Sequence, residues 1–202
     1  MYNSFCALIG VVVDNNEEIR TDIQRPVVTM VLFSESDRRW NTFVKVIVEK
    51  NEDIKKAQNI QEGDIVLVIG VPSYMDGIGY CVYANNVIFL SKNKQEVPLP
   101  YRKAMALEYE KNDNLVQIVG KVCSVQGDKL YAIVKRKSLL RGEVAMHDTV
   151  PLYMNSRVDL KEGDNINFIG VFTQNKIIGT AIKIDLEDVE SEECNRSSAD
   201  DI

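Results

Sequence analysis

The feature that most constrains this chain is an internal repeat, in which one pattern of apolar residues and glycines occurs twice. The first copy begins with ALIGVVV at residues 7–13, and the second begins with QIVGKV at 117–122. Later segments match position for position, QEGDIVLVIGV at 61–71 and KEGDNINFIGV at 161–171. Such a repeat predicts two copies of one structural unit, arranged one after the other along the chain.

Each copy has the apolar pattern of β-strands, with β-branched runs, alternation and intervening turn residues. The strands predicted in the first copy are 5–14, 26–34, 40–49, 64–72 and 79–90, and those in the second copy are 114–125, 129–137, 147–154, 164–173 and 176–184. A short helix is predicted over 51–59, with Asn51 as its cap and with Ile54, Ala57 and Gln58 facing inward. Five strands with a helix after the third are the order of the OB fold, so the sequence predicts an all-β chain of two tandem OB-fold five-stranded barrels.

Glycines recur at matching positions of the two copies. Gly10 and Gly120 fall inside predicted strands, where the missing side chain permits a sharp bend or bulge. Gly63 and Gly163 each precede an aspartate and a strand, as expected of a turn with a positive backbone angle.

The chain divides into two barrels, a linker and a tail. We expect the first barrel over 1–91, a linker with a short helix over 92–112, the second barrel over 113–184 and a disordered acidic tail over 185–202. The net charge of the chain is −6, and the tail carries eight acids against one base, which gives −7. The remaining residues are therefore close to neutral, about +1, and overall acidity does not argue against a local basic face.

Several function classes find no support in the residues. The sequence has no phosphate-binding glycine loop, no nucleophile elbow and no Cys-x-x-Cys pair, and His147 is its only histidine. We therefore expect no enzymatic activity, no cofactor and no metal. The absence of a long apolar run and of a signal-like start favours a cytoplasmic protein without a membrane segment, and the spacing of Cys6, Cys81 and Cys123 suits reduced, buried thiols.

The first copy resembles the bacterial single-stranded DNA-binding protein family over about residues 3–91. The resemblance is carried by an Ile-Gly pair in the first strand, by MVLFSES at 30–36, by WNTFVKVIV at 40–48, by the EGD turn at 62–64 and by NNVIFL at 85–90. It implies binding of single-stranded DNA in replication, recombination or repair. A chain with two OB domains looks like the subgroup of that family in which two such chains form a homodimer.

Binding of single-stranded DNA needs cations along a groove and flat rings beside them. In the first copy these are Arg38 and Arg39 in the loop before Trp40, then Lys45, Tyr74, Tyr80 and Tyr83. Phe43 alternates with Lys45. By contrast, Phe5, Phe33 and Phe89 stand in apolar runs, and we expect them in the core.

The second copy has fewer rings and a denser run of positive charge. Its candidates are Lys135, Arg136, Lys137 and Arg141, which would follow phosphates by charge, and Tyr131 as a stacking residue, with Tyr153 as a second one. The same residues also fit a solvated strand end, and the two interpretations stay open at this point.

The tail is a candidate for partner binding. The resemblance implies that an acidic tail docks replication or repair proteins through its tip, which here is Asp200, Asp201 and Ile202, although the Pro-Phe usual in the family is absent. Two other functions remain open from the sequence. In one, the barrels serve as the protein scaffold of a primosome-like assembly, and in the other they bind RNA.

Overall fold

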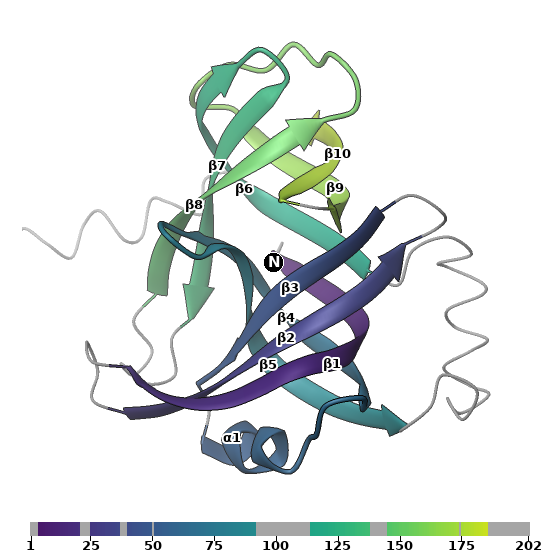
Figure 1. Cartoon of the computed structure of the whole chain (residues 1–202). Coiled ribbons are helices and arrows are strands. Elements are labelled where there is room, and N and C mark those ends of the chain that lie inside the picture. The colour runs from purple at the N-terminus through teal and green to yellow at the C-terminus, as the bar shows by residue number, and fades with distance from the viewer. Residues whose placement is uncertain are drawn as a thin grey trace, which may run out of the picture.

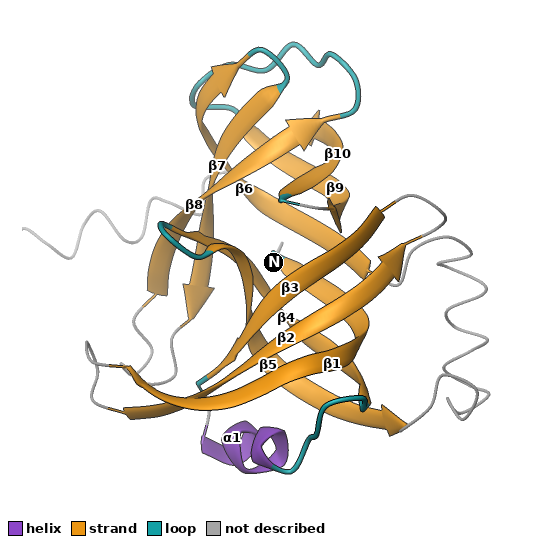
Figure 2. Ribbon diagram, viewed as in Figure 1, coloured by secondary structure: helices purple, strands orange, loops and turns teal. Residues whose placement is uncertain are grey.

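The computed structural model describes residues 4–20, 25–36, 40–49, 51–91, 114–137, 145–173 and 175–185. Within these ranges the chain is all-β with one short helix, as predicted (Figures 1 and 2). The elements are β1 (Phe5–Arg20), β2 (Arg25–Ser36), β3 (Trp40–Val48), α1 (Asn51–Gln58), β4 (Ile65–Met75), β5 (Gly79–Ser91), β6 (Asn114–Gln126), β7 (Lys129–Lys137), β8 (Ala145–Met154), β9 (Asn165–Thr173) and β10 (Lys176–Lys183).

The first five strands close into an OB-like barrel. They pair in the order β1, β2, β3, β5, β4 and back to β1, and the β3–β5 pair is parallel whereas the others are antiparallel. Alternate side chains such as Leu8, Met30, Leu32 and Val46 are fully buried inside this circuit. Every strand of the barrel pairs with two neighbours, so none has an edge that is unpaired over its full length.

The second five strands pair in the same order. The circuit runs β6, β7, β8, β10, β9 and back to β6, and again only the third and fifth strands, β8 and β10, pair in parallel. A register shift between Val12 and Asp14 in β1 recurs between Val122 and Ser124 in β6. The sequence repeat is therefore also a repeat of strand pairing.

The glycine-aspartate turns of the two halves make equivalent backbone hydrogen bonds. Gly63 N–H donates to Val12 O at 2.8 Å, and Gly163 N–H donates to Val122 O at 2.9 Å. Both glycines have a positive φ, +87° and +91°, which favours a residue without a Cβ. In the second turn the Asp164 carboxylate accepts the Lys161 N–H and pairs with Lys183, and these contacts lower the pKa of Asp164.

The strand glycines allow close approach of the backbone. A Cβ on Gly10 would lie 2.8 Å from the carbonyl oxygen of Phe33, and one on Gly120 would lie 2.2 Å from that of Ile133. Any side chain there would force the first and second strands of the half apart.

The two halves join through their first strands. β1 and β6 pair antiparallel, with Phe5 opposite Gln117, Cys6 opposite Val116 and Ala7 opposite Leu115. In the repeat, Gly10 corresponds to Gly120 and hence Cys6 to Val116, so the pairing is centred on one pair of equivalent residues. This is the self-complementary contact of a two-fold dimer, built here within one chain.

Side-chain contacts between the halves follow the same pseudo-two-fold relation. Thr42 Oγ1 in β3 donates to Thr173 O at the end of β9, at 3.1 Å. The equivalent strands make the reciprocal contact, in which Ser73 Oγ at the end of β4 donates to Asp148 Oδ2 in β8. Together with the β1–β6 pairing, these contacts fix one half against the other.

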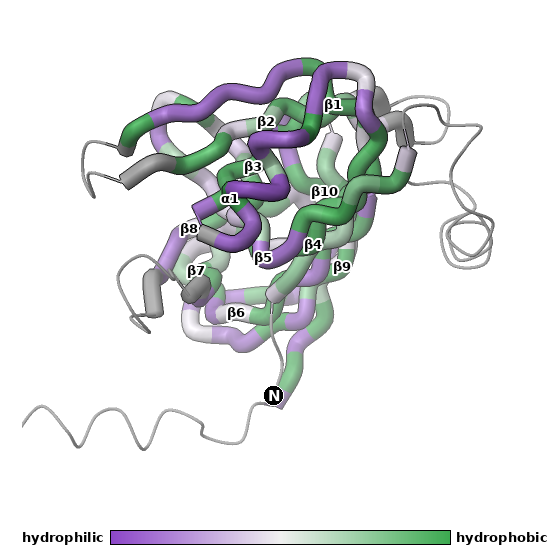
Figure 3. Tube along the Cα trace, turned by 90° about the horizontal axis from the view of Figure 1, so that it is seen from below, coloured by the Kyte–Doolittle hydropathy of each residue, from purple (hydrophilic) through white to green (hydrophobic). Residues whose placement is uncertain are grey.

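Helix α1 lies at the end of the first barrel that is farther from the second half (Figure 1). Ile54 and Ala57 are buried against the barrel as predicted, whereas Gln58 is exposed, which corrects its predicted inward orientation. Asn15 Nδ2 donates to the Ala57 and Ile60 carbonyls, at 2.9 and 2.6 Å, and so satisfies acceptors at the end of the helix. In Figure 3 this helix is mainly hydrophilic, whereas β4 is mainly hydrophobic.

The linker predicted at 92–112 and the tail beyond residue 185 lie outside the described residues. The helix predicted in the linker and the disorder predicted for the tail therefore stay predictions. Strand β1 continues to Arg20, beyond the predicted end at residue 14, because its polar second half pairs with β2 without an apolar pattern. No helix in the described part of the chain has the length and apolar character of a membrane span.

Candidate nucleic-acid interface

The outer face of β2 and β3 carries a pair of aromatic rings, one exposed and one half-buried. Phe33 and Phe43 are opposite each other in the β2–β3 ladder, and their ring centroids are 5.2 Å apart. Phe43 is 65% exposed. An exposed ring backed by a second ring on a rigid sheet is a surface on which a planar group can stack.

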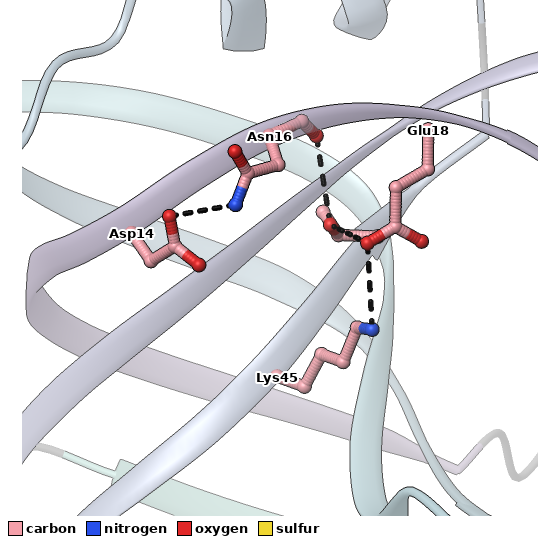
Figure 4. A network of polar contacts seen from close by, with 5 residues as sticks. Asp14, Asn16, Glu18 and Lys45 are labelled. Atoms are coloured by element: carbon pink, nitrogen blue, oxygen red, sulfur yellow. Dashed lines mark hydrogen bonds and ion pairs between the residues drawn. The ribbon is translucent and has the colours of Figure 1, made fainter.

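Lys45, two residues after Phe43 in β3, forms an ion pair with a carboxylate of β1 (Figure 4). Lys45 Nζ is 3.8 Å from Glu18 Oε1, and the same oxygen accepts a hydrogen bond from Thr29 Oγ1 at 2.9 Å. Asn16 Nδ2 donates to Asp14 Oδ1 at 2.7 Å in the adjoining part of β1. The charge of Lys45, a predicted site residue, is thus partly balanced by Glu18.

The predicted loop residues lie partly beyond the described chain. Arg38 and Arg39 are outside the described residues. Trp40 is the first residue of β3 and is paired with Ser36 of β2. The structure describes only its backbone, and its stacking role stays a prediction.

Tyr83 does not fit the predicted stacking role. It is only 6% exposed and packs with Ile47 and Cys81, and its hydroxyl donates to Met75 Sδ at 3.3 Å. A ring stacks on a base only through a free face, so we correct this prediction and regard Tyr83 as a packing residue. Its position in β5, beside a parallel strand, buried a ring that the sequence assigned to a loop cluster.

Tyr74 and Tyr80 connect the first half to the second. They face each other across the β4–β5 hairpin, edge to face, with centroids 5.0 Å apart. The Tyr80 hydroxyl donates to Pro151 O in β8 at 2.8 Å. Burial raises the pKa of Tyr80 well above its ordinary value, and the nearby Tyr153 and Tyr74 hydroxyls raise it further.

The outer face of β7 and β8 carries tyrosines with lysines over their rings. Lys129 Nζ is 4.8 Å from the centroid of Tyr131 and 5.7 Å from that of Tyr153, and Lys176 Nζ is 5.2 Å from that of Tyr153. Hydrogen bonding to the Tyr131 hydroxyl raises the pKa of Lys129. We call these four residues the tyrosine–lysine platform. All four are half-buried.

The other predicted residues of the second half lie farther along β7. Lys135 is exposed, opposite His147, and shares the outer face with Tyr131. Arg136 and Lys137 complete β7, but their side chains are not described, and Arg141 lies outside the described residues. The structure therefore brings Tyr74, Tyr80 and Tyr131 together beside the β7–β8 face and leaves Lys45 apart from them, on the β2–β3 face.

The two outer faces differ because the two hairpins differ in length. Thirteen residues separate the paired Gly70 and Ala84 of the first half, against eight between Gly170 and Gly179 of the second. The longer hairpin, between β4 and β5, reaches Pro151 and covers part of the β7–β8 face. The β2–β3 face, which carries Phe43, stays open. One face is thus open and aromatic, and the other is partly covered and cationic.

Sequence reasoning placed some rings wrongly and missed two lysines. Phe89 is 51% exposed rather than in the core, and Phe5 and Phe33 are only half-buried. Lys129 and Lys176 were not among the predicted residues. The repeat contained a signal for them, because each immediately follows a turn that leads into the second or fifth strand of its half.

The described residues contain no group of three or more histidine, cysteine and carboxylate side chains that could hold a metal ion. The interface consists instead of rings, hydroxyls and ammonium groups. These groups bind through stacking, hydrogen bonding and charge.

Comparison with known proteins supports the fold. Residues 148–201 match a family model described as the Wolframin C-terminal OB-fold domain. The wild-type single-stranded DNA binding protein from Thermus aquaticus has a similar structure, with a TM-score of 0.58, 10% identity and coverage of 95% of this chain and 98% of that chain. A deletion mutant of the same protein gives a TM-score of 0.57 at 13% identity, with coverage of 94% and 98%. No curated protein matches the sequence.

Replacing Tyr80 with Phe tests the bridge between the halves. At pH 7 the variant loses one hydrogen bond, and we expect its free energy of unfolding to fall by about 0.5–1.5 kcal/mol. The folded state keeps the Tyr80 proton, whereas the unfolded chain releases it above the ordinary tyrosine pKa of about 10. Wild-type stability therefore falls with rising pH above about 10 more steeply than that of the variant.

Denaturant unfolding of both proteins from pH 7 to 11 measures this difference. The gap in stability narrows above pH 10 if Tyr80 is held neutral in the fold. A constant gap over the whole range would contradict the assigned environment of Tyr80.

Proposed function

We propose that this chain binds single-stranded DNA without changing it chemically, through the outer faces of two tandem OB-fold barrels. The observation that carries the proposal is the open Phe33–Phe43 pair on β2 and β3. In OB folds the face of the second and third strands and the adjoining loops bind oligonucleotides. We propose that the barrels span 1–91 and 113–184, with the linker at 92–112 and the tail at 185–202.

A single strand fits this face better than a duplex does. Unpaired bases offer free ring faces, and stacking of each base contributes about 1–3 kcal/mol. Bases in a duplex are already stacked and are not free to lie on a ring at the outside of a barrel. The similar fold of the Thermus aquaticus single-stranded DNA binding protein supports the same choice.

The setting of this activity is replication, recombination or repair of DNA. A protein that holds a strand by stacking and charge protects it and leaves it available to enzymes. The tail, ending in Asp200, Asp201 and Ile202, is proposed as the segment that contacts such partner proteins.

Replacing Phe43 with Ala tests the open face. We expect its affinity for oligothymidine to fall by about 5- to 150-fold, which corresponds to the loss of one stacked base at about 1–3 kcal/mol. Phe43 is exposed, so its truncation leaves the barrel core unchanged. Quenching of Trp40 fluorescence by oligothymidine measures the affinity.

Phe89→Ala is the matched control, because Phe89 is 51% exposed and lies on β5, outside the β2–β3 face. Its affinity should equal that of the wild type. Equal affinity of the Phe43 variant and the wild type, with both folded, would show that the strand does not lie on this face. Tighter binding of duplex DNA or of RNA of the same length would favour another ligand.

We further propose a homodimer that forms through a second surface, the sheet face. It is the outer side of β4, β1, β6, β9 and β10, where paired residues continue from strand to strand: Ile69, Ala7 and Leu115, then Val171 and Ile178, with Ile169 and Ile182 beside them. Ile69, Ile169 and Ile182 are 37%, 51% and 55% exposed. Extended apolar surface of this kind on a folded chain is typical of a protein–protein contact.

Ile169→Lys tests this surface by placing a charge at its centre. We expect the variant to sediment as a monomer at concentrations at which the wild type is a dimer, because an unpaired charge in an apolar interface is costly. Ile19→Lys makes the same change at a 73% exposed residue outside the sheet face and should remain dimeric. A monomeric wild type at micromolar concentration would remove the proposal.

A further inference from the structure

The tyrosine–lysine platform holds two ammonium groups without carboxylate partners. Lys45, Lys56 and Lys183 each pair with a described carboxylate, whereas no described carboxylate pairs with Lys129 or Lys176. Each ammonium lies over a tyrosine ring instead, Lys176 over Tyr153 and Lys129 between Tyr153 and Tyr131. A ring attracts the cation without neutralising its charge, so both groups remain available to an anion.

The rings of the platform are less suited to stacking than Phe43 is. Tyr131 and Tyr153 are half-buried, and each has an ammonium group over its ring. The long hairpin of the first half further restricts access, because Tyr80 is bonded to Pro151, directly opposite Tyr131 in the β7–β8 ladder. The platform therefore presents charge where the other face presents a ring.

Equivalent positions of the first half have the opposite character. In the matched ladders, Phe33 and Phe43 correspond to Ile133 and Thr149, and the pair Val31 and Lys45 corresponds to Tyr131 and Pro151. The exposed ring of the first half is thus replaced by a small hydroxyl residue. Lys45 on that face is 3.8 Å from Glu18, whereas no carboxylate in the described part of the chain pairs with either platform lysine.

We propose that the two halves divide the work of binding, with bases stacked on the Phe33–Phe43 face and backbone phosphates bound by Lys129 and Lys176. This inference rests on the proposed function and assigns a chemical class of ligand, the phosphodiester group, to the platform. Each ammonium group carries three N–H donors, and phosphate oxygens are their acceptors. The tyrosines act as positioning residues that limit the freedom of the two side chains.

The test is the salt dependence of binding. Labelled oligothymidine is titrated with wild type, with the double variant Lys129→Gln/Lys176→Gln and with Phe43→Ala at several salt concentrations. Each phosphate contact on a single strand contributes about −0.7 to the log–log slope, so the double variant should have a slope shallower by about 1.4. Phe43→Ala should bind more weakly with an unchanged slope.

Lys183→Gln is the matched control, because Lys183 is an exposed lysine paired with Asp164 at 3.0 Å. Its slope should equal that of the wild type. A second ligand, an abasic oligomer of the same length, separates phosphate from base contacts. The double variant should lose most of the wild-type affinity for it, and Phe43→Ala should lose none.

The outcomes separate the inference from the proposed function. If the wild type binds oligothymidine but the double variant keeps the wild-type slope, or binds the abasic oligomer as the wild type does, the platform does not hold phosphates and only the inference fails. If the wild type binds no oligothymidine at low salt, the proposed function fails with it. A shallower slope in the double variant alone supports both.

Discussion

Pairing of β1 with β6 is the constraint on which the rest of this structure depends. Because the pairing is centred on Cys6 and Val116, equivalent residues of the repeat, it relates the two halves by a pseudo-two-fold rotation. That rotation brings β3 of the first half to the end of β9 and β8 of the second half to the end of β4. Each outer face is therefore flanked by the hairpin between the last two strands of the opposite half.

The difference between the two hairpins then makes the faces unequal. A long β4–β5 hairpin lies against β8 through Tyr80, whereas the short β9–β10 turn leaves Phe43 exposed. A duplicated barrel with identical hairpins would present two equivalent faces. Here the same register carries an aromatic pair in one half and cations held over tyrosines in the other, so the two faces differ in side-chain chemistry as well as in access.

The repeat alone predicted most of the fold and little of the site. All ten strands and the helix were predicted from apolar alternation and the matched glycines, since these patterns are local and occur twice. Burial of Tyr83 and exposure of Phe89 were not predictable, because they depend on which outer surface another strand or half covers. The platform was missed for a similar reason: Lys176 and Tyr153 are distant in sequence and meet only through the parallel pairing of β8 with β10.

We propose that one DNA strand contacts an outer face of each half. The most direct measurement is the acylation rate of individual lysines, followed by mass spectrometry, with and without saturating oligothymidine. We expect the oligonucleotide to slow acylation of Lys45 on the first half and of Lys129 and Lys176 on the second, and to leave the rate at Lys183 unchanged. Protection of Lys183 would contradict this expectation. So would acylation rates at Lys45, Lys129 and Lys176 that do not change when the DNA is bound.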